Sequence, residues 1–266
     1  KEGFLKSAYS AYRERSLGLG AMGFHSYLQS KNIPFEGIFA TGFNYKAFKY
    51  IKRHSLKATE RLADERGESP DVNGSGRRNA HLLAVAPNAS SSIICGGTSP
   101  SIEPYRANLY THKTLSGSFQ VKNKYLEEIL NNKGLKKKEL IAVWKDIAGN
   151  EGSVQHLDIL TDEEKEIFKT ANEIDQIWIV EHASKRQEFI CQAQSVNLFF
   201  TIPTATEPQK VHDEYMQYVN DVHWYGMNKL KSLYYFRTNA ARNAENVNTK
   251  VQRIKLDDAE CIACEG

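Results

Sequence analysis

The fold class follows from one stretch of the chain, VNLFFTIPTATEPQKVHDEYMQYVNDVHWYGMNKLKSLYYF, which covers residues 196–236. It opens with a nearly continuous apolar run at 196–202 and closes with a second one at 233–236. Between them, apolar residues recur at helical spacing from Val211 to Leu230. A strand, a helix and a second strand in this order favour a right-handed βαβ unit with parallel strands. The sequence therefore predicts an α/β fold.

Other predicted elements extend outward from this unit. Residues 81–87, HLLAVAP, form another apolar run and predict a strand that is buried on both faces. Helices are predicted at 24–28, 44–66 and 126–150. The apolar pattern stops at Ala240, so we expect residues 1–240 to form the folded domain and residues 241–266 to form a flexible tail.

The composition is that of an ordinary globular chain, with 266 residues, 41% hydrophobic residues and a net charge of +3. No apolar run approaches the ~18 residues of a membrane span, and the small charge does not favour a dedicated nucleic-acid binder. The first residues lack the apolar core of a secretory signal, and four cysteines are too few for a disulfide scaffold. We therefore expect a cytoplasmic protein without nucleic-acid or membrane partners. Because residue 1 is Lys, we also expect the sequence to begin inside a longer reading frame.

A serine-rich loop directly follows the strand predicted at 81–87, and it consists of Pro87, Asn88, Ala89, Ser90, Ser91 and Ser92. Ligands of parallel sheets bind beyond the carboxyl ends of the strands, where such loops begin. Hydroxyl groups beside successive backbone N–H groups form a good cradle for an anion. A serine-rich helix N-cap is the competing interpretation, and the sequence alone leaves both open.

Residues 18–23, GLGAMG, match the G-x-G-x-x-G pattern of dinucleotide-binding loops. That pattern requires a hydrophobic strand before it, and residues 11–16, AYRERS, cannot form one. Glu36 is the only acid near the position that would hold the ribose. A tight turn and close packing by glycine are therefore the better interpretation, with a nicotinamide enzyme as a minor alternative.

Two adjacent tyrosines, Tyr234 and Tyr235, lie in the last apolar run. Adjacent aromatic residues of a regular strand point to opposite faces and usually belong to the core. If the two rings stack instead, the backbone must depart from ideal extension. Oxidation of a tyrosine at neutral pH removes the phenolic proton together with an electron, so two close phenols are able to relay a radical.

A C-x-x-C pair, Cys261 and Cys264, lies close to the C-terminal end. Such a pair can form a small-loop disulfide or supply half of a zinc site, but the sequence offers no second pair to complete one. On a polar tail, the pair indicates a dithiol that shuttles reducing equivalents, with two incidental cysteines as the alternative. Cys191 is expected to be a buried hydrophobe within a helix, and His212 and His223 are expected to be exposed rather than metal ligands.

Taken together, these segments resemble the C-terminal portion of the large, catalytic subunit of class I ribonucleotide reductase. The resemblance rests on short segments in a fixed order: RSLGLGAMG (15–23), RNAHL (78–82), APNASSS (86–92), SIEP (101–104), TLSGSFQ (114–120) and LKSLYY (230–235). The terminal dithiol completes the set. Each segment alone is weak, but their order and spacing together are specific.

The resemblance implies the C-terminal part of a ten-stranded α/β barrel and a radical reaction that converts ribonucleoside diphosphates to deoxyribonucleoside diphosphates. A small subunit with a metal-radical cofactor would pass its radical through Tyr234 and Tyr235 to a cysteine at the barrel centre, so no cofactor is expected in this chain. The resulting thiyl would remove the ribose 3′ hydrogen, and a cysteine pair would reduce the 2′ carbon. Cys261 and Cys264 would reduce that pair again, and thioredoxin or glutaredoxin would reset them. Residues 87–92 would hold the substrate diphosphate.

Two parts of the family pattern are missing from this sequence: the Asn-Leu-Cys-x-Glu loop that carries the radical cysteine, and the partner cysteines of the reducing pair. The resemblance therefore implies a split large subunit, whose N-terminal half lies on a separate chain. A partial barrel exposes two sheet edges, so we expect obligate assembly with that companion. The alternative is a non-catalytic dithiol carrier or interaction module, which would not need the serine-rich loop.

Overall fold

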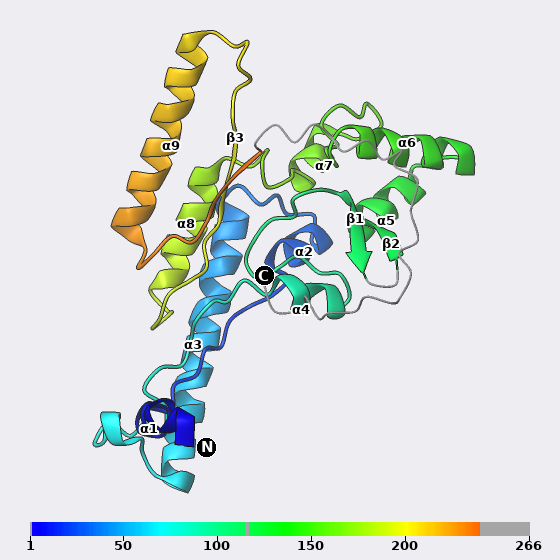
Figure 1. Ribbon diagram of the computed structural model, residues 1–266. Helices are drawn as coiled ribbons and strands as arrows, with labels where there is room; N and C mark the ends of the chain where they lie inside the picture. Colours follow the sequence, from blue (N-terminus) through cyan, green and yellow to red (C-terminus); the bar gives the residue numbers. More distant parts are fainter. Residues whose placement is uncertain (1, 115–116, 240–266) are drawn as a thin grey trace.

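The computed structural model describes residues 2–114 and 117–239 (Figure 1). The α-helices are α1 (Leu5–Glu14), α2 (Phe24–Ser30), α3 (Ile38–Arg66), α4 (Ala89–Ile94), α5 (Lys124–Asn132), α6 (Lys137–Gly149), α7 (Asp162–Ile167), α8 (Gln176–Gln187) and α9 (Gln209–Lys229). The strands are β1 (Leu109–Thr114), β2 (Gly117–Lys122), β3 (Leu198–Thr201) and β4 (Phe236–Asn239), and short 3-10 turns cover Glu2–Phe4 and Pro70–Val72. The predicted boundary at residue 240 and the predicted tail, with Cys261 and Cys264, lie outside the described residues.

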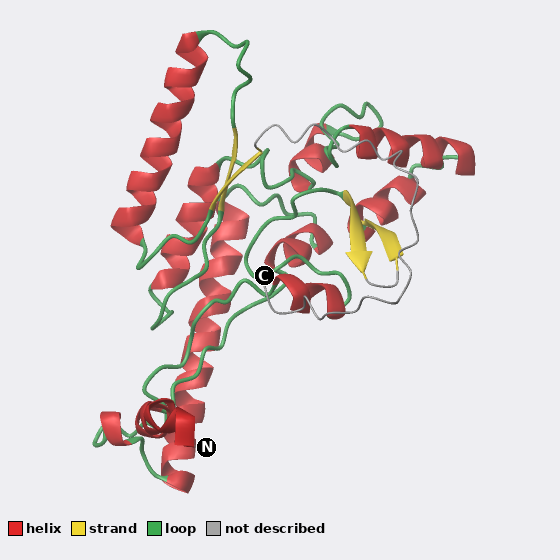
Figure 2. Cartoon of the chain, in the orientation of Figure 1, coloured by secondary structure: helices red, strands yellow, loops and turns green. Residues whose placement is uncertain are grey.

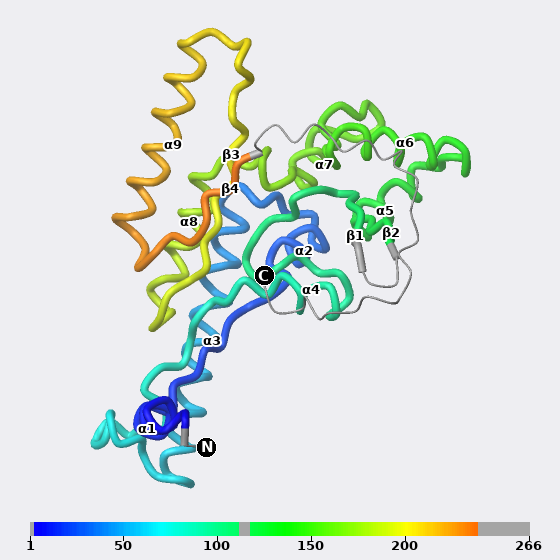
Figure 3. The backbone as a smooth tube through the Cα atoms, in the orientation of Figure 1, coloured from blue at the N-terminus to red at the C-terminus, as the bar shows by residue number. Residues whose placement is uncertain are grey.

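A parallel array of extended segments organises the molecule, and its members, in order of adjacency, are residues 17–20, 82–85, 192–201 and 234–239. Isolated parallel bridges join Leu19 to Leu83 and Val85 to Gln194. β3 pairs with β4 as a regular parallel ladder (Figure 3). Within the described residues, the first and the last segment each have a neighbour on one side only, so the array is open.

The βαβ unit predicted at 196–236 is present as β3, α9 and β4, and the predicted α/β fold is confirmed. β4 begins at Phe236, later than the predicted start at residue 233. The two tyrosines before this strand also bond to the neighbouring segment, with Tyr234 N–H donating to Val196 O and Leu198 N–H donating to Tyr235 O, but the regular ladder pairs only residues from Phe236 onward.

The strand predicted at 81–87 is wrong as a regular strand, although its side chains Leu82, Leu83 and Val85 are buried as expected. On one side its neighbour is the glycine-rich segment 17–20, and glycine weakens a strand. On the other side a tight turn, in which Val196 N–H donates to the carbonyl two residues earlier (3.0 Å), interrupts the ladder. Only single bridges therefore form.

Helices α3, α8 and α9 lie side by side with α8 between the other two, and α8 also packs against β3 (Figures 1 and 2). α3 begins at Ile38, before the predicted start at residue 44. The prediction missed this first turn because Ile38 and Phe39 are exposed and do not continue the apolar pattern of the buried face. The main core combines apolar side chains of these helices, of α2, of the loop between α2 and α3, and of the array: Phe24, Leu28, Phe35, Phe48, Leu83, Val85, Ile179, Val180, Val196, Leu198, Phe199 and Val222.

A second core lies under the β1–β2 hairpin and joins it to α5, α6 and α7 through Leu109, Leu126, Leu130, Trp144, Ile147, Leu157, Ile167 and Phe168. The single helix predicted at 126–150 is wrong, because α5 ends at Asn132 and α6 starts at Lys137. Gly134 has a positive φ of 73°, which ends the first helix. Glu139 accepts the backbone N–H of Lys136 and so caps the second.

A buried arginine joins α3, α8 and the parallel array. Arg186 of α8 is 1% exposed, and its guanidinium donates to Asn44 Oδ1 (2.9 Å) and Gln194 Oε1 (3.0 Å). The ring centroids of Phe24 and Phe48 each lie 5.6 Å from the guanidinium carbon. Burial lowers the pKa of Arg186 to about 9, which leaves the side chain charged at neutral pH. One cation thus holds three elements together.

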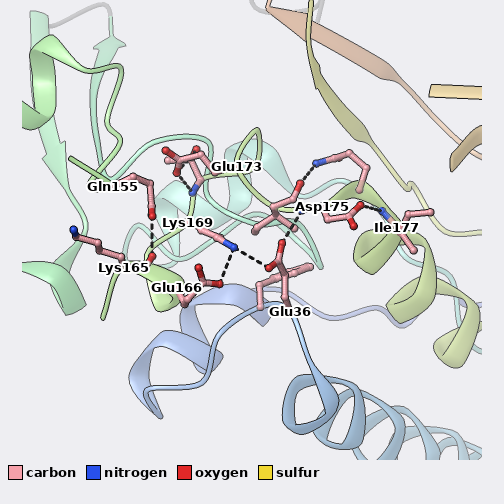
Figure 4. A network of polar contacts seen from close by, with 12 residues as sticks. Glu36, Gln155, Lys165, Glu166, Lys169, Glu173, Asp175 and Ile177 are labelled. Atoms are coloured by element: carbon pink, nitrogen blue, oxygen red, sulfur yellow. Dashed lines mark hydrogen bonds and ion pairs between the residues drawn. The ribbon is translucent and has the colours of Figure 1, made fainter. Parts of the chain in front are cut away.

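A polar network fixes α9 to the start of α8. Lys169 Nζ lies 2.9 Å from Glu36 Oε2, and Asp175 N–H donates to Glu36 Oε1 (2.7 Å) (Figure 4). Tyr218 of α9 donates its phenolic proton to Asp175 Oδ1 (2.7 Å) and accepts the N–H of Gln176 (2.8 Å). Burial, together with the Asp175 carboxylate, raises the pKa of Tyr218, so the phenol remains a donor.

Cys191 lies beyond the end of α8 at Gln187 and is partly exposed, so the prediction of a buried helical residue is wrong. The chain turns after α8 and brings this thiol to the array, where the backbone N–H groups of Leu82 (3.1 Å) and Leu83 (3.2 Å) donate to the sulfur. Burial alone would raise the pKa of Cys191, but these two donors together with the charge of Lys52 outweigh it and lower the pKa.

His212 is partly exposed and His223 is exposed on α9. Among residues 2–114 and 117–239, no group of three or more His, Cys, Asp or Glu side chains is arranged to hold a metal ion. Over the same residues, no helix combines the length and the apolar character that crossing a membrane would require.

We expect acid to destabilise the fold through two buried histidines, His25 and His182. Burial lowers the pKa of His25 to about 3 and that of His182 to about 4, from an ordinary value of 6.5. Because the folded state holds both rings neutral, their contribution is complete above pH 6.5 and is lost as the pH falls toward 4 and then 3. Each ring adds at most about 1.4 kcal/mol per pH unit to this loss.

Urea unfolding between pH 7 and pH 4.5 measures the effect. His182→Gln should flatten the dependence of the unfolding free energy on pH, whereas the matched change of an exposed ring, His223→Gln, should leave it unaltered. Identical slopes for the wild type and His182→Gln would contradict the assignment.

Candidate functional site

The serine-rich loop emerges from the carboxyl end of the segment 82–85, as predicted, and turns at once into α4. Asn88 has a positive φ of 53° and makes no side-chain cap bond, so the simple N-cap interpretation fails for this residue. Ser92 is buried and donates its hydroxyl to Ala89 O (2.7 Å), whereas Ser90 and Ser91 are exposed. The first N–H groups of a helix have no partner within the helix, so this turn presents donors outward.

Two pockets flank α4. The smaller pocket has a volume of about 270 Å³, and its lining combines loop residues with the glycine-rich segment: Gly18, Leu19, Gly20, Ala21, Met22, Ala84, Ala86, Asn88 and Ser91. No side chain in this lining carries a charge. The arrangement suits an anion bound by backbone N–H groups and neutral side chains.

The glycine-rich segment approaches its neighbour closely, in agreement with the packing interpretation of GLGAMG. A Cβ atom added at Gly20 would lie 2.8 Å from Ala84 O, which is closer than real Cβ atoms approach another heavy atom. Residues before the segment form helix α1, so the hydrophobic strand of a dinucleotide fingerprint does not precede it. Both observations disfavour the nicotinamide alternative.

The larger pocket, of about 470 Å³, lies on the other side of α4 and is lined by Pro87, Ala89, Ser92, Ile93, Pro100, Glu103, Tyr105, Arg106, Ala107, Tyr110, Asn197 and Arg237. It joins part of the predicted loop to charged residues that the sequence did not single out as site residues. Arg106 lies over the ring of Phe199 at 5.3 Å. Burial raises the pKa of Glu103, and the hydrogen bond from Asn197 and the charges of Arg106 and Arg237 oppose that rise.

The segment SPSIEP (99–104) holds this site against α2. Ser26 and Ser99 exchange hydrogen bonds, with Ser26 N–H donating to Ser99 Oγ (3.1 Å) and Ser99 N–H donating to Ser26 Oγ (2.7 Å). Phe24 N–H donates to Ser101 O (3.2 Å), which satisfies another donor at the start of α2. The segment therefore serves as a buried helix cap and delivers Glu103 to the larger pocket.

The rings of Tyr234 and Tyr235 lie in contact, with centroids 4.1 Å apart and planes inclined by 47°. The core interpretation of this pair is wrong, because the two side chains are 49% and 50% exposed. Both residues precede β4, so the rings need not alternate across a sheet. Interaction with the neighbouring phenol of Tyr235 raises the pKa of Tyr234.

Arg237 connects the tyrosine pair to the larger pocket. Its guanidinium lies 5.1 Å from the centroid of the Tyr235 ring, and it lines the pocket together with residues of the serine-rich loop. The structure thus brings the predicted loop and the predicted tyrosines to one region. Cys261 and Cys264 lie outside the described residues. Asn197 and Arg237 could have been suspected from their positions next to the strand β3 and the tyrosine pair, but no motif signals them.

Comparison with known proteins identifies the family. A family model described as the ribonucleotide reductase barrel domain matches residues 4–75 and 69–236. The chain belongs to the ribonucleotide reductase family.

Relatives of this ribonucleotide reductase chain are considerably longer than the chain itself. It is 43% identical to the ribonucleoside-diphosphate reductase large subunit of Invertebrate iridescent virus 3 over 265 residues, which cover 98% of this chain and 40% of that protein. It is also 43% identical to the putative large subunit of Frog virus 3 (isolate Goorha), over 98% of this chain and 44% of that protein. The Actinobacillus ureae class Id ribonucleotide reductase alpha subunit matches with a TM-score of 0.72 and 41% identity, over 88% of this chain and 41% of that one.

The predicted resemblance is confirmed at the level of the family and of its barrel fold. The chain spans about 40% of the length of the curated ribonucleotide reductase subunits described above. An open array of parallel segments is the structure expected of such a share of a barrel.

We expect Gly20→Ala to destabilise this reductase chain by about 1–3 kcal/mol, because the new methyl group would press against the backbone at Ala84. The matched control is Gly42→Ala, within α3, where an added Cβ meets nothing within 4 Å. That change should instead stabilise the chain by about 0.5–1 kcal/mol. Thermal unfolding measures the change in melting temperature of both variants. Equal changes for the two would show that the backbone approach at Gly20 is not tight.

Proposed function

We propose that this chain is the C-terminal part of a ribonucleoside-diphosphate reductase, which converts ribonucleoside diphosphates to deoxyribonucleoside diphosphates by radical chemistry for DNA synthesis. The observation that carries the proposal is the contact between Tyr234 and Tyr235, beside a pocket that the serine-rich loop borders. The relatives named for this activity match 98% of this chain within longer chains.

The substrate diphosphate binds at the serine-rich loop, residues 87–92, on the side of the smaller pocket. The first turn of α4 supplies outward N–H groups, and Asn88 and Ser91 supply neutral side chains in the lining. Glycine at position 20 lets the backbone opposite come close, so a compact anion is enclosed on both sides. Backbone N–H groups and short neutral side chains lie directly at this pocket, so a diphosphate can be bound there without a lysine or arginine side chain.

Tyr234 and Tyr235 relay the radical from a small subunit that holds a metal-radical cofactor. Each transfer moves one electron and one proton, and the contact between the two rings keeps the transfer distance short. Half of each ring is exposed, which leaves it accessible from a docked partner. The relay ends at a cysteine outside this sequence, which as a thiyl removes the ribose 3′ hydrogen.

The reduction consumes two thiols and leaves a disulfide near the substrate. Cys261 and Cys264 exchange with that disulfide, become oxidised themselves and restore the two thiols. Thioredoxin or glutaredoxin then reduces the pair again. The proposal therefore requires the dithiol to reach both places.

The radical cysteine and the remaining barrel strands lie on a companion chain, the N-terminal half of a split large subunit. The open edge of the array supports this part of the proposal, because Leu17 and Leu19 are each 51% exposed along it. An apolar, half-paired edge of this kind favours association with further strands.

The tyrosine relay is tested in the complex of this chain with its companion and the small subunit. Tyr234→Phe or Tyr235→Phe should abolish the formation of deoxyribonucleoside diphosphate, because phenylalanine has no phenolic proton to lose. Binding of the companion should be unchanged, and Tyr50→Phe, on the exposed face of α3, should keep full turnover. Full activity of the two pair variants would refute the relay, and a wild-type complex that neither binds nor reduces the nucleotide would favour a dithiol carrier.

The shuttle is tested with two reductants. Cys261→Ser should stop turnover driven by thioredoxin but allow turnover with a small dithiol that reaches the barrel directly. Cys95→Ser, a change at another cysteine that is exposed, should affect neither reaction. Equal loss with both reductants in Cys261→Ser would rule out a shuttle.

A further inference from the structure

Two residues outside the predicted site, Glu103 and Asn197, connect the larger pocket to the tyrosine pair. They are 6% and 2% exposed. Asn197 Nδ2 donates to Glu103 Oε1, and Asn197 Oδ1 accepts the backbone N–H of Tyr235 at 3.1 Å. Because a carboxylate accepts and a backbone N–H donates, these two partners fix the orientation of the amide.

The tyrosine rings need an anchor of this kind because burial does not hold them. Both rings are about half exposed, so their position depends on the backbone that carries them. Two backbone bonds tie this stretch to the neighbouring segment: Tyr234 N–H donates to Val196 O, and Leu198 N–H donates to Tyr235 O, each at 2.9 Å. The third bond is the one that Tyr235 N–H donates to the Asn197 side chain, and it is the only one of the three whose acceptor is held by Glu103.

Glu103 also acts on Tyr235 through charge. Arg237 lies over the Tyr235 ring at 5.1 Å, and the Glu103 carboxylate attracts this guanidinium. A cation over the face of a ring opposes the removal of an electron from that ring, and a nearby carboxylate offsets its field. Loss of the Glu103 charge would therefore leave Tyr235 harder to oxidise.

We propose that Glu103 and Asn197 are positioning residues of the radical relay, which hold Tyr235 against Tyr234 and balance the charge of Arg237. The inference rests on the proposed function, and it adds residues that belong to neither the serine-rich loop nor the tyrosine pair. Both residues line the larger pocket together with Pro87, so they lie between the two parts of the predicted site.

The first test reads the local structure and needs no turnover. With 3-fluorotyrosine placed at position 235 of the full chain, Glu103→Gln should shift the ¹⁹F resonance, because the anchor and the local charge both change. The matched control is Glu173→Gln, which alters a carboxylate that accepts from Ser153 and Thr170 and does not line the pocket. Its resonance should match the wild type. If Glu103→Gln fails to fold, Asn197→Ser breaks the same link from the other side and supplies the same measurement.

The second test separates chemistry from substrate binding in the assembled complex. Glu103→Gln should lower kcat about tenfold, while KM for the ribonucleoside diphosphate stays within about twofold. An unchanged ¹⁹F resonance in both Glu103→Gln and Asn197→Ser, or a kcat no lower than that of Glu173→Gln, would overturn the inference. A wild-type complex without turnover would instead contradict the proposed function, and the resonance would still decide whether Glu103 positions Tyr235.

Discussion

The buried guanidinium of Arg186 is the constraint on which the rest of the structure depends. Removing a charge from water is costly unless its hydrogen-bonding groups find partners, and here two amide oxygens and two phenyl faces surround it. α3, α8 and the segment after α8 must therefore stay closed around the side chain. Gln194, one of the two acceptors, also forms a parallel β-bridge with Val85. The hydrogen bond from Arg186 to Gln194 therefore also holds the third segment of the array against the second.

The register of that array explains why the loop and the tyrosines meet. Val85 lies beside Gln194, and Leu198 lies beside Phe236. Pro87 lies two residues beyond Val85 on one segment, and Val196 lies two residues beyond Gln194 on the next. Val196 in turn accepts the backbone N–H of Tyr234. The start of the serine-rich loop and the tyrosine pair thus emerge at about the same level of the array, although nearly 150 residues separate them in sequence.

Much of this arrangement could be predicted because it follows from local patterns. Apolar periodicity reports which residues an element buries, and it located β3, α9 and the serine-rich loop that follows the apolar run at 81–87. It could not locate the break between α5 and α6, where a glycine turn interrupts a continuous apolar pattern. It also could not reveal the bond between Asn197 and Glu103, since the two residues are 94 positions apart in sequence and no apolar pattern connects them. Contacts of this kind arise only once the segments are packed.

The tyrosine pair shows why such unpredicted contacts gather at a functional site. A side chain that exchanges a radical with a partner has to remain accessible, so close packing cannot fix its position as it fixes Phe199 or Val222. The geometry must then come from backbone hydrogen bonds and from buried polar groups beneath the exposed rings. Buried polar groups are costly unless each one is satisfied, and the amide of Asn197 meets that requirement with a carboxylate on one side and a backbone N–H on the other. Accessibility of the rings and burial of their support are therefore two consequences of the same physical demand.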